Sequence, residues 1–203
     1  MSHFNKDKKE FFNTLANRWD KTFYNDKLES RLSEIVSMMN LKEGSLILEV
    51  GAGTGNLIPH LIKAINSRWH IYAIDYAEEM ISCAKKKYKA IQNVTFDVVD
   101  AANLPYIDEL FDYVICFGSF PHFDDKPKAL KEIARVLVKG GRLFIAHALS
   151  SEEIKHHHSR CLPVANDQLP EKEEMQILLE KAGTNIIRYI DKEGLYLCEG
   201  EKI

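Results

Sequence analysis

The residues with the most evident chemistry form a glycine-rich loop directly after a short aliphatic run. Residues 46–56 read LILEVGAGTGN, so Glu49 lies at the end of the run and Gly51, Gly53 and Gly55 occupy alternate positions. Glycine has no Cβ, so the backbone here can turn tightly and approach a bound molecule closely. A helical apolar pattern follows, and its free N–H groups point back at the loop. This arrangement predicts a site for a nucleotide-type cofactor.

The spacing of the loop separates the ligands that could use it. A phosphate-binding P-loop has Lys and Ser or Thr after its last glycine, whereas Asn56 and Leu57 stand here. A dinucleotide loop has a third glycine or alanine where this chain has Asn56. The Glu49 carboxylate repels a phosphate and attracts a cation. S-adenosylmethionine (SAM) carries a sulfonium and an ammonium and no phosphate, so the loop favours SAM.

Histidines are the second set of residues with chemistry. His122 follows the fourth strand that we expect, and His147 ends the fifth, so both should lie at the ligand edge of a parallel sheet. Imidazole titrates near neutrality and suits a general base or a substrate contact. The run His156–His158 falls in a helical stretch, where consecutive residues point about 100° apart. One or at most two of the three can therefore join a site.

The same histidines allow a metal alternative. His122, His147 and His158, together with Asp167, could bind zinc or ferrous iron that activates an acceptor. No H-x-x-x-H or C-x-x-C spacing supports a metal. We therefore expect no metal, and we expect the histidines to act as bases or substrate contacts.

The elements that must position these residues alternate along the chain. Helical patterns at 7–18 and 27–40 precede the first strand, and strands 71–74, 94–99, 111–117 and 142–148 follow, with helices 77–90 and 126–138 among them. Gly140-Gly141 is expected to end the last of these helices. A helix at 170–182 and strands 185–190 and 194–199, joined by a turn at 191–194, end the sequence. The prediction is an α/β fold: a doubly wound, mostly parallel seven-stranded sheet with helices on both faces and a C-terminal antiparallel hairpin.

The length of 203 residues predicts a single domain. Within 1–203 we expect an N-terminal helical lid (1–42), a cofactor-binding core (43–150), and acceptor-side helices with the terminal hairpin (151–203).

The motif Glu49-Val50-Gly51-Ala52-Gly53-Thr54-Gly55 resembles the first motif of the class I SAM-dependent methyltransferases, and the match runs in order over about residues 40–150. The resemblance implies the following cofactor contacts: Gly51, Ala52, Gly53 and Gly55 in the loop, Glu49 near the methionine ammonium, Asp75 on the ribose, Tyr76 and Met80 beside the adenine, Asp100 and Ala101 on the adenine edge, Phe117 and Gly118 along the methionyl moiety, and Trp19 and Tyr24 in a lid.

The segments Phe120-Pro121-His122-Phe123 and 163–170, with His147, resemble a bacterial and archaeal subgroup of small methyltransferases, in which the last helical histidine matches His158. The implied function is transfer of a methyl group from SAM to a small-molecule acceptor, leaving S-adenosylhomocysteine. Three alternatives stay open: a SAM-binding sensor or partner subunit without its own catalysis, a metal-assisted methyltransferase, and an NAD-dependent oxidoreductase.

Composition limits the partners. Net charge is −3 without a long basic tract, and the stretch after the fourth strand lacks the Asn/Asp-Pro-Pro-aromatic run of base methyltransferases, so we expect no nucleic acid partner. Cys83, Cys116, Cys161 and Cys198 form no C-x-x-C pair and are expected to be reduced thiols in the cytoplasm. No apolar run is long enough for a membrane span, and we expect a monomer or homodimer.

Overall fold

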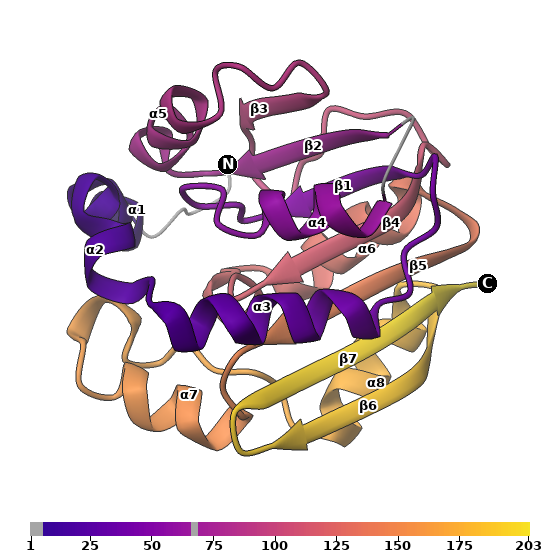
Figure 1. The fold of residues 1–203 in the computed structure, drawn as a ribbon. Coiled ribbons are helices and arrows are strands. Elements are labelled where there is room, and N and C mark those ends of the chain that lie inside the picture. The colour runs from indigo at the N-terminus through magenta and orange to yellow at the C-terminus, as the bar shows by residue number, and fades with distance from the viewer. Residues whose placement is uncertain (1–5, 66–68) are drawn as a thin grey trace.

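A seven-stranded sheet in the order β3-β2-β1-β4-β5-β7-β6 forms the centre of the protein (Figure 1). The structure is a computed structural model that describes residues 6–65 and 69–203; the first five residues of the expected lid lie outside this part. The strands are β1 (Leu46–Val50), β2 (His70–Asp75), β3 (Val94–Val98), β4 (Phe111–Phe117), β5 (Leu137–His147), β6 (Thr184–Lys192) and β7 (Leu195–Lys202). Pairing from β3 to β5 is parallel, and β7 is antiparallel to both β5 and β6. The predicted α/β fold is confirmed.

Helices cover both faces of the sheet. The helices α3 (Asp26–Met38), α4 (Ile58–Ile65) and α5 (Glu78–Lys87) pack on one face, and α6 (Lys126–Val136), α7 (Ser151–His158) and α8 (Lys172–Lys181) pack on the other. Side chains alternate between these layers along each strand, so Ile47 joins the first core and Leu48 joins the second. Both are fully buried, as a parallel strand covered on two faces requires.

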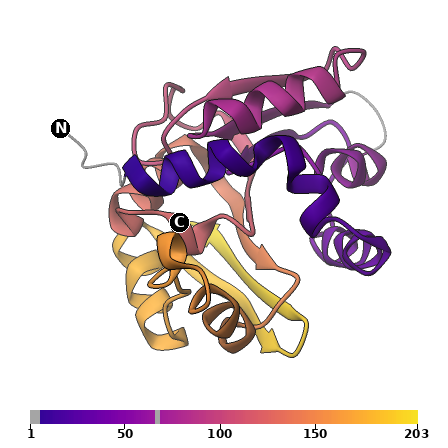
Figure 2. The same ribbon diagram turned by 90° about the vertical axis from the view of Figure 1, so that its left-hand side faces the viewer.

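The N-terminal segment lies across the edge where the parallel strands end (Figure 2). The predicted helix 7–18 is α1 (Lys6–Leu15) followed by a 3₁₀ turn (Ala16–Arg18), and a further short helix α2 (Trp19–Phe23) precedes α3. Asn25 begins α3 because its side-chain oxygen accepts the Leu28 N–H at 3.0 Å. Tyr24 and Asn25 have extended backbones, so the chain changes direction between α2 and α3.

The start of β5 differs from the prediction. The helix expected over 126–138 ends at Val136, and β5 begins at once, with Gly140 and Gly141 inside it rather than at the helix end. The pairing with β4 shifts between Phe111 and Tyr113, and Gly140 has φ +72°. The two glycines therefore serve an irregularity of the strand, not a helix cap.

The C-terminal hairpin turns at Glu193-Gly194 and places β7 between β5 and β6. Glu199 on β7 is buried and binds Arg142 of β5 at 2.6 Å and Arg188 of β6 at 2.7 Å, which joins the three strands by charge. Over 6–65 and 69–203, no helix has both the length and the apolar character that a membrane crossing needs.

Gly51 provides a test of how the loop is packed. It has φ +77°, and a Cβ there would overlap the Cβ of Ser119, whereas Gly53 has φ +56° and open space around it. We expect Gly51→Ala to lower the free energy of unfolding by about 3 kcal/mol, from strain and overlap together, and Gly53→Ala by about 1 kcal/mol, from strain alone. Urea denaturation measures both, and equal losses would contradict this packing.

Candidate functional site

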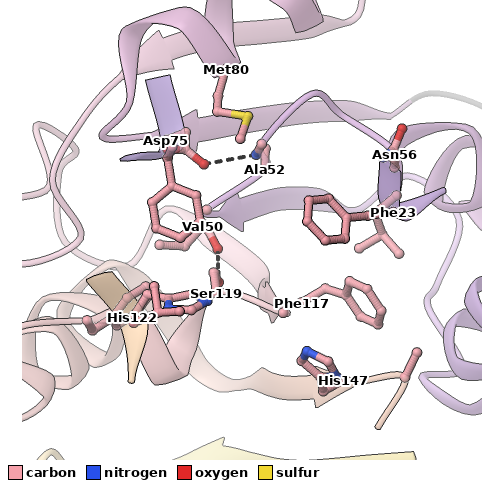
Figure 3. A pocket seen from close by; sticks show the side chains of 18 of the residues that line it. Phe23, Val50, Ala52, Asn56, Asp75, Met80, Phe117, Ser119, His122 and His147 are labelled. Carbon is pink, nitrogen blue, oxygen red and sulfur yellow. Dashed lines mark hydrogen bonds between the residues drawn. The ribbon is translucent and has the colours of Figure 1, made fainter. Parts of the chain in front are cut away.

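One large cavity lies beyond the carboxyl ends of β1, β2, β4 and β5, beneath the N-terminal helices (Figure 3). Its volume is about 1110 Å³. Pockets for single small molecules typically measure about 300–1000 Å³, so this one can hold two molecules together. In Figure 3, Asp75 and Met80 lie on one side of the cavity, and His122 and His147 lie on the other.

Most of the residues singled out in the sequence line this cavity. They are Trp19, Glu49, Gly51, Ala52, Gly53, Asp75, Tyr76, Met80, Asp100, Ala101, Phe117, Gly118, His122, His147 and His158. Tyr24 and Gly55 do not line it. The neighbouring Phe23 lines the cavity, and the Tyr24 ring lies near the Lys87 ammonium. Gly55 instead makes room for the Tyr88 ring, whose hydroxyl donates to the Gly55 carbonyl at 2.8 Å.

Asp75 ends β2 and joins the glycine loop to the start of α5. One carboxylate oxygen accepts the Gly53 N–H and the other accepts the Ala77 N–H, both at 2.9 Å. Burial raises the pKa of Asp75 to about 6 in spite of these bonds. Each oxygen keeps a second lone pair, so the group can also accept hydroxyls from a ligand.

Glu49 is a buried carboxyl group whose ionised form is poorly compensated. Its side chain is 2% exposed, and Oε2 has no hydrogen-bond partner. Burial, together with the Asp75 charge, raises the pKa of Glu49 to about 8. Such a group is costly in an apolar setting unless a cation arrives. The wall of the cavity beside the loop is therefore prepared for a positively charged ligand.

Asp20 is a residue whose role the sequence did not reveal. From α2 its carboxylate accepts the Thr54 hydroxyl at 2.6 Å and the Asn56 amide at 3.0 Å, and it pairs with Lys87 at 2.9 Å. These contacts fasten the N-terminal helices to the glycine loop. Burial opposes ionisation, but the hydrogen bonds outweigh it and hold the pKa of Asp20 below its usual value.

His147 presents a fixed tautomer. Its Nδ1 accepts the backbone N–H of Leu149 at 3.0 Å, so the ring proton of the neutral form lies on Nε2. Burial lowers the pKa of His147 to about 3. The ring stacks with Phe117 at 6.2 Å between centroids. At neutral pH this side chain can donate a hydrogen bond from Nε2, but it cannot accept a proton there.

His122 has the opposite arrangement. Its Nδ1–H donates to the Asp167 carboxylate at 2.7 Å, which leaves a lone pair on Nε2. Burial lowers the pKa of His122 and exceeds the opposing effect of Asp167. For Asp167, burial is outweighed by hydrogen bonds from His122 and Lys8, so its pKa is held low. The pair is a neutral imidazole oriented by a carboxylate, which is the arrangement of a general base.

His158 is the member of the histidine run that reaches the site. Its Nδ1–H donates to the Asp167 backbone carbonyl at 2.6 Å, and its ring lies 4.9 Å from that of His122. His157 lines the edge of the cavity and is exposed, while His156 is exposed and contacts Arg160. The expectation of one or two site residues agrees with this placement.

The geometry does not assemble the candidate metal ligands. Asp167 lies behind His122, where its two oxygens contact Lys8 and His122, and it does not line the cavity. Among the residues that the structure describes, no group of three His, Cys, Asp or Glu side chains is arranged to hold a metal ion.

Comparison with known proteins identifies the family. The sequence profile described as "Methyltransferase domain" matches residues 48–145. An O-methyltransferase of Aspergillus nomiae is 30% identical over 185 residues, which are 85% of this chain and 80% of that protein. The chain belongs to the class I SAM-dependent methyltransferases. The resemblance of the glycine motif is thereby confirmed, and an NAD-dependent oxidoreductase is no longer a candidate.

Two further comparisons place this methyltransferase among its relatives. The demethylmenaquinone methyltransferase of Staphylococcus epidermidis is 36% identical over 107 residues, which are 53% of this chain and 44% of that protein. The chain therefore spans less than half the length of that relative. A SAM-dependent methyltransferase from Aquifex aeolicus has the same fold, with a TM-score of 0.74 at 24% identity, over 96% of this chain and 98% of that one.

The unbalanced carboxylate of this methyltransferase gives a prediction with a definite sign. The pKa of Glu49 is raised in the folded state, so its stabilising contribution is present below the unfolded value of about 4.5 and is lost as pH rises through about 8. We expect Glu49→Gln to be more stable than the wild type at pH 9 by a few kcal/mol and equally stable at pH 4.5. Urea denaturation at both pH values measures this. The exposed Glu152→Gln is the control, and a wild type without the added loss at pH 9 would contradict the burial of an unbalanced charge.

Proposed function

We propose that this chain transfers a methyl group from SAM to a small-molecule acceptor and leaves S-adenosylhomocysteine. The observation that carries the proposal is that one cavity combines an unbalanced carboxylate beside the glycine loop with three imidazoles of defined tautomer. The carboxylate suits a cationic cofactor. The imidazoles suit an acceptor that forms hydrogen bonds and gives up a proton. The name of the staphylococcal relative, a demethylmenaquinone methyltransferase, is consistent with a small-molecule acceptor, and that of the Aspergillus relative, an O-methyltransferase, with methylation of an oxygen.

The residues beside the loop would hold the cofactor. Asp75 would accept the ribose hydroxyls, and Glu49 would balance the methionine ammonium. The other contacts are Tyr76 and Met80 beside the adenine, Asp100 and Ala101 on its edge, Phe117 and Gly118 along the methionyl part, and Gly51–Gly53 and Trp19 around it. When bound, SAM supplies an activated methyl group on its sulfonium. The chain then needs only to exclude water, align the acceptor and manage its proton.

The three histidines would divide the work on the acceptor. His122 Nε2 takes the proton of an acceptor hydroxyl, while Asp167 stabilises the imidazolium that forms. His147 donates from Nε2 and holds an acceptor oxygen in place. The His158 ring, whose centroid lies 4.9 Å from that of His122, offers a second lone pair for another donor on the acceptor. This set fits an uncharged hydroxylated molecule, and it supports an enzyme over a SAM-binding sensor without catalysis.

The proposal is tested in two steps. Isothermal titration with S-adenosylhomocysteine is expected to give a single site that Asp75→Asn weakens at least tenfold, because the ribose loses a charged partner. NAD serves as the control ligand. Incubation with methyl-labelled SAM and a panel of phenols, hydroquinones, amines and acids is expected to label a hydroxylated member. Binding without transfer to any member, with or without added cell extract, would favour the sensor.

The histidines are expected to affect different kinetic constants. His122→Asn should lower kcat a hundredfold or more, since it removes the base, while affinity for S-adenosylhomocysteine is retained. His147→Ala should mainly raise KM for the acceptor. Because burial lowers the pKa of His122, the wild-type rate should be full at neutral pH and fall only in acid. The exposed His156→Ala is the control, and unchanged rates for both site variants would refute these roles.

A further inference from the structure

A buried lysine of the N-terminal helix lies behind the proposed base. The Lys8 side chain is only 5% exposed, and lysine is rarely buried unless it is paired. Its ammonium contacts Asp167 Oδ1 at 2.9 Å, Asp124 Oδ1 at 2.9 Å and the His122 carbonyl at 3.2 Å. One side chain of α1 thus joins the loop after β4 to the segment between α7 and α8.

The Asp167 carboxylate is divided between Lys8 and His122. Oδ1 receives Lys8, Oδ2 receives the His122 Nδ1–H at 2.7 Å, and the backbone carbonyl receives His158. One turn along α1 from Lys8, the Phe12 ring packs edge-on against the His122 ring at 5.1 Å. Helix α1 therefore contacts His122 directly through Phe12 and indirectly through Asp167.

We propose that Lys8 is a positioning residue for His122, so that docking of α1 over the cavity and preparation of the base are one event. The role as a base rests on the proposed function; the coupling of Lys8 to His122 does not. With α1 docked, Lys8 fixes the Asp167 rotamer and shares its charge. Without Lys8, the whole Asp167 charge faces His122 and favours the imidazolium, which cannot accept a proton.

The charges around His122 define the sign of this coupling. The titratable groups that act on His122 are Lys8, His147, His158 and Asp167. Beside them, Asp124 pairs with Lys8, and the Lys126 ammonium donates to the carbonyls of Pro121 and Phe123. Lys8 is the cation that shares a carboxylate with it, and it opposes protonation of the ring. By linkage, protonation of His122 must in turn weaken the docking of α1.

The test uses the imidazole itself as the reporter and needs no acceptor. The protein is labelled with ¹³Cε1-histidine, the His122 signal is assigned by its loss in His122→Asn, and its pKa is read from an NMR titration. We expect Lys8→Met to raise the His122 pKa by about one unit. The matched control is Lys9→Met, which removes a neighbouring α1 lysine that pairs with Glu78 of α5 instead, and it should leave His122 unchanged.

An unchanged His122 pKa in Lys8→Met, or an equal change in Lys9→Met, would overturn the proposal. If Lys8→Met does not fold, Lys8→Gln removes the charge and keeps a hydrogen-bond donor. Hydrogen exchange of the wild type gives an independent measure of the coupling between His122 and α1. The protection factors of the backbone amides of 6–15, corrected for the intrinsic pH dependence of exchange, should decrease as pH falls in the wild type but not in His122→Asn. The same pH dependence of the protection factors in the two proteins would also overturn the proposal. If the His122 pKa depends on Lys8 but the protein transfers no methyl group, the proposed function is refuted and the coupling of Lys8 to His122 still holds.

Discussion

The Asp75 carboxylate is the interaction on which the site depends. Its two oxygens accept the N–H groups of Gly53 and Ala77, so a single side chain fixes both the glycine loop after β1 and the start of α5 after β2. These segments are adjacent only because β1 and β2 are parallel neighbours in the sheet. The cavity wall near the loop exists because one buried acid satisfies backbone donors from two connections at once.

Burying acids in this wall has an energetic cost that the rest of the fold must offset. Asp75 retains some compensation from the backbone, whereas Glu49 has an oxygen with no partner. The free energy that offsets this cost comes from burial of the apolar layers on either face of the sheet, where residues such as Ile47 and Leu48 are fully buried. A site that is unfavourable when empty and favourable with a cation gains specificity from that difference.

The sequence was sufficient for the features that depend on local pattern. Short apolar runs that alternate with helical patterns predicted the strands. Asp75 and His147 end two of these strands, and both line the cavity because the carboxyl ends of parallel strands share one edge of the sheet. Spacing did not indicate that Gly55 packs against Tyr88 or that Phe23 rather than Tyr24 lines the cavity, because tertiary packing decides both.

Long-range contacts account for the rest. Nothing in the chain near Lys8 or Asp167 indicates that they meet, since 159 positions separate them. The tautomers of His122 and His147 likewise depend on which partner each Nδ1 finds in the fold, and no spacing encodes that choice. The start of β5 was missed because a Gly-Gly pair is a common helix stop, and here the strand takes it up as an irregularity.

The strand order has a consequence for the time course of synthesis. Because β7 lies between β5 and β6, it fills a slot between two strands that precede it in the chain. Until β7 is present, β6 has no partner in the sheet, and Arg142 and Arg188 lack the Glu199 carboxylate that joins them. A nascent chain can form the parallel part of the sheet from β3 to β5 first, but β6 can join the sheet only after β7 has been made. Chains interrupted within β7 should therefore expose two strand edges and be prone to association.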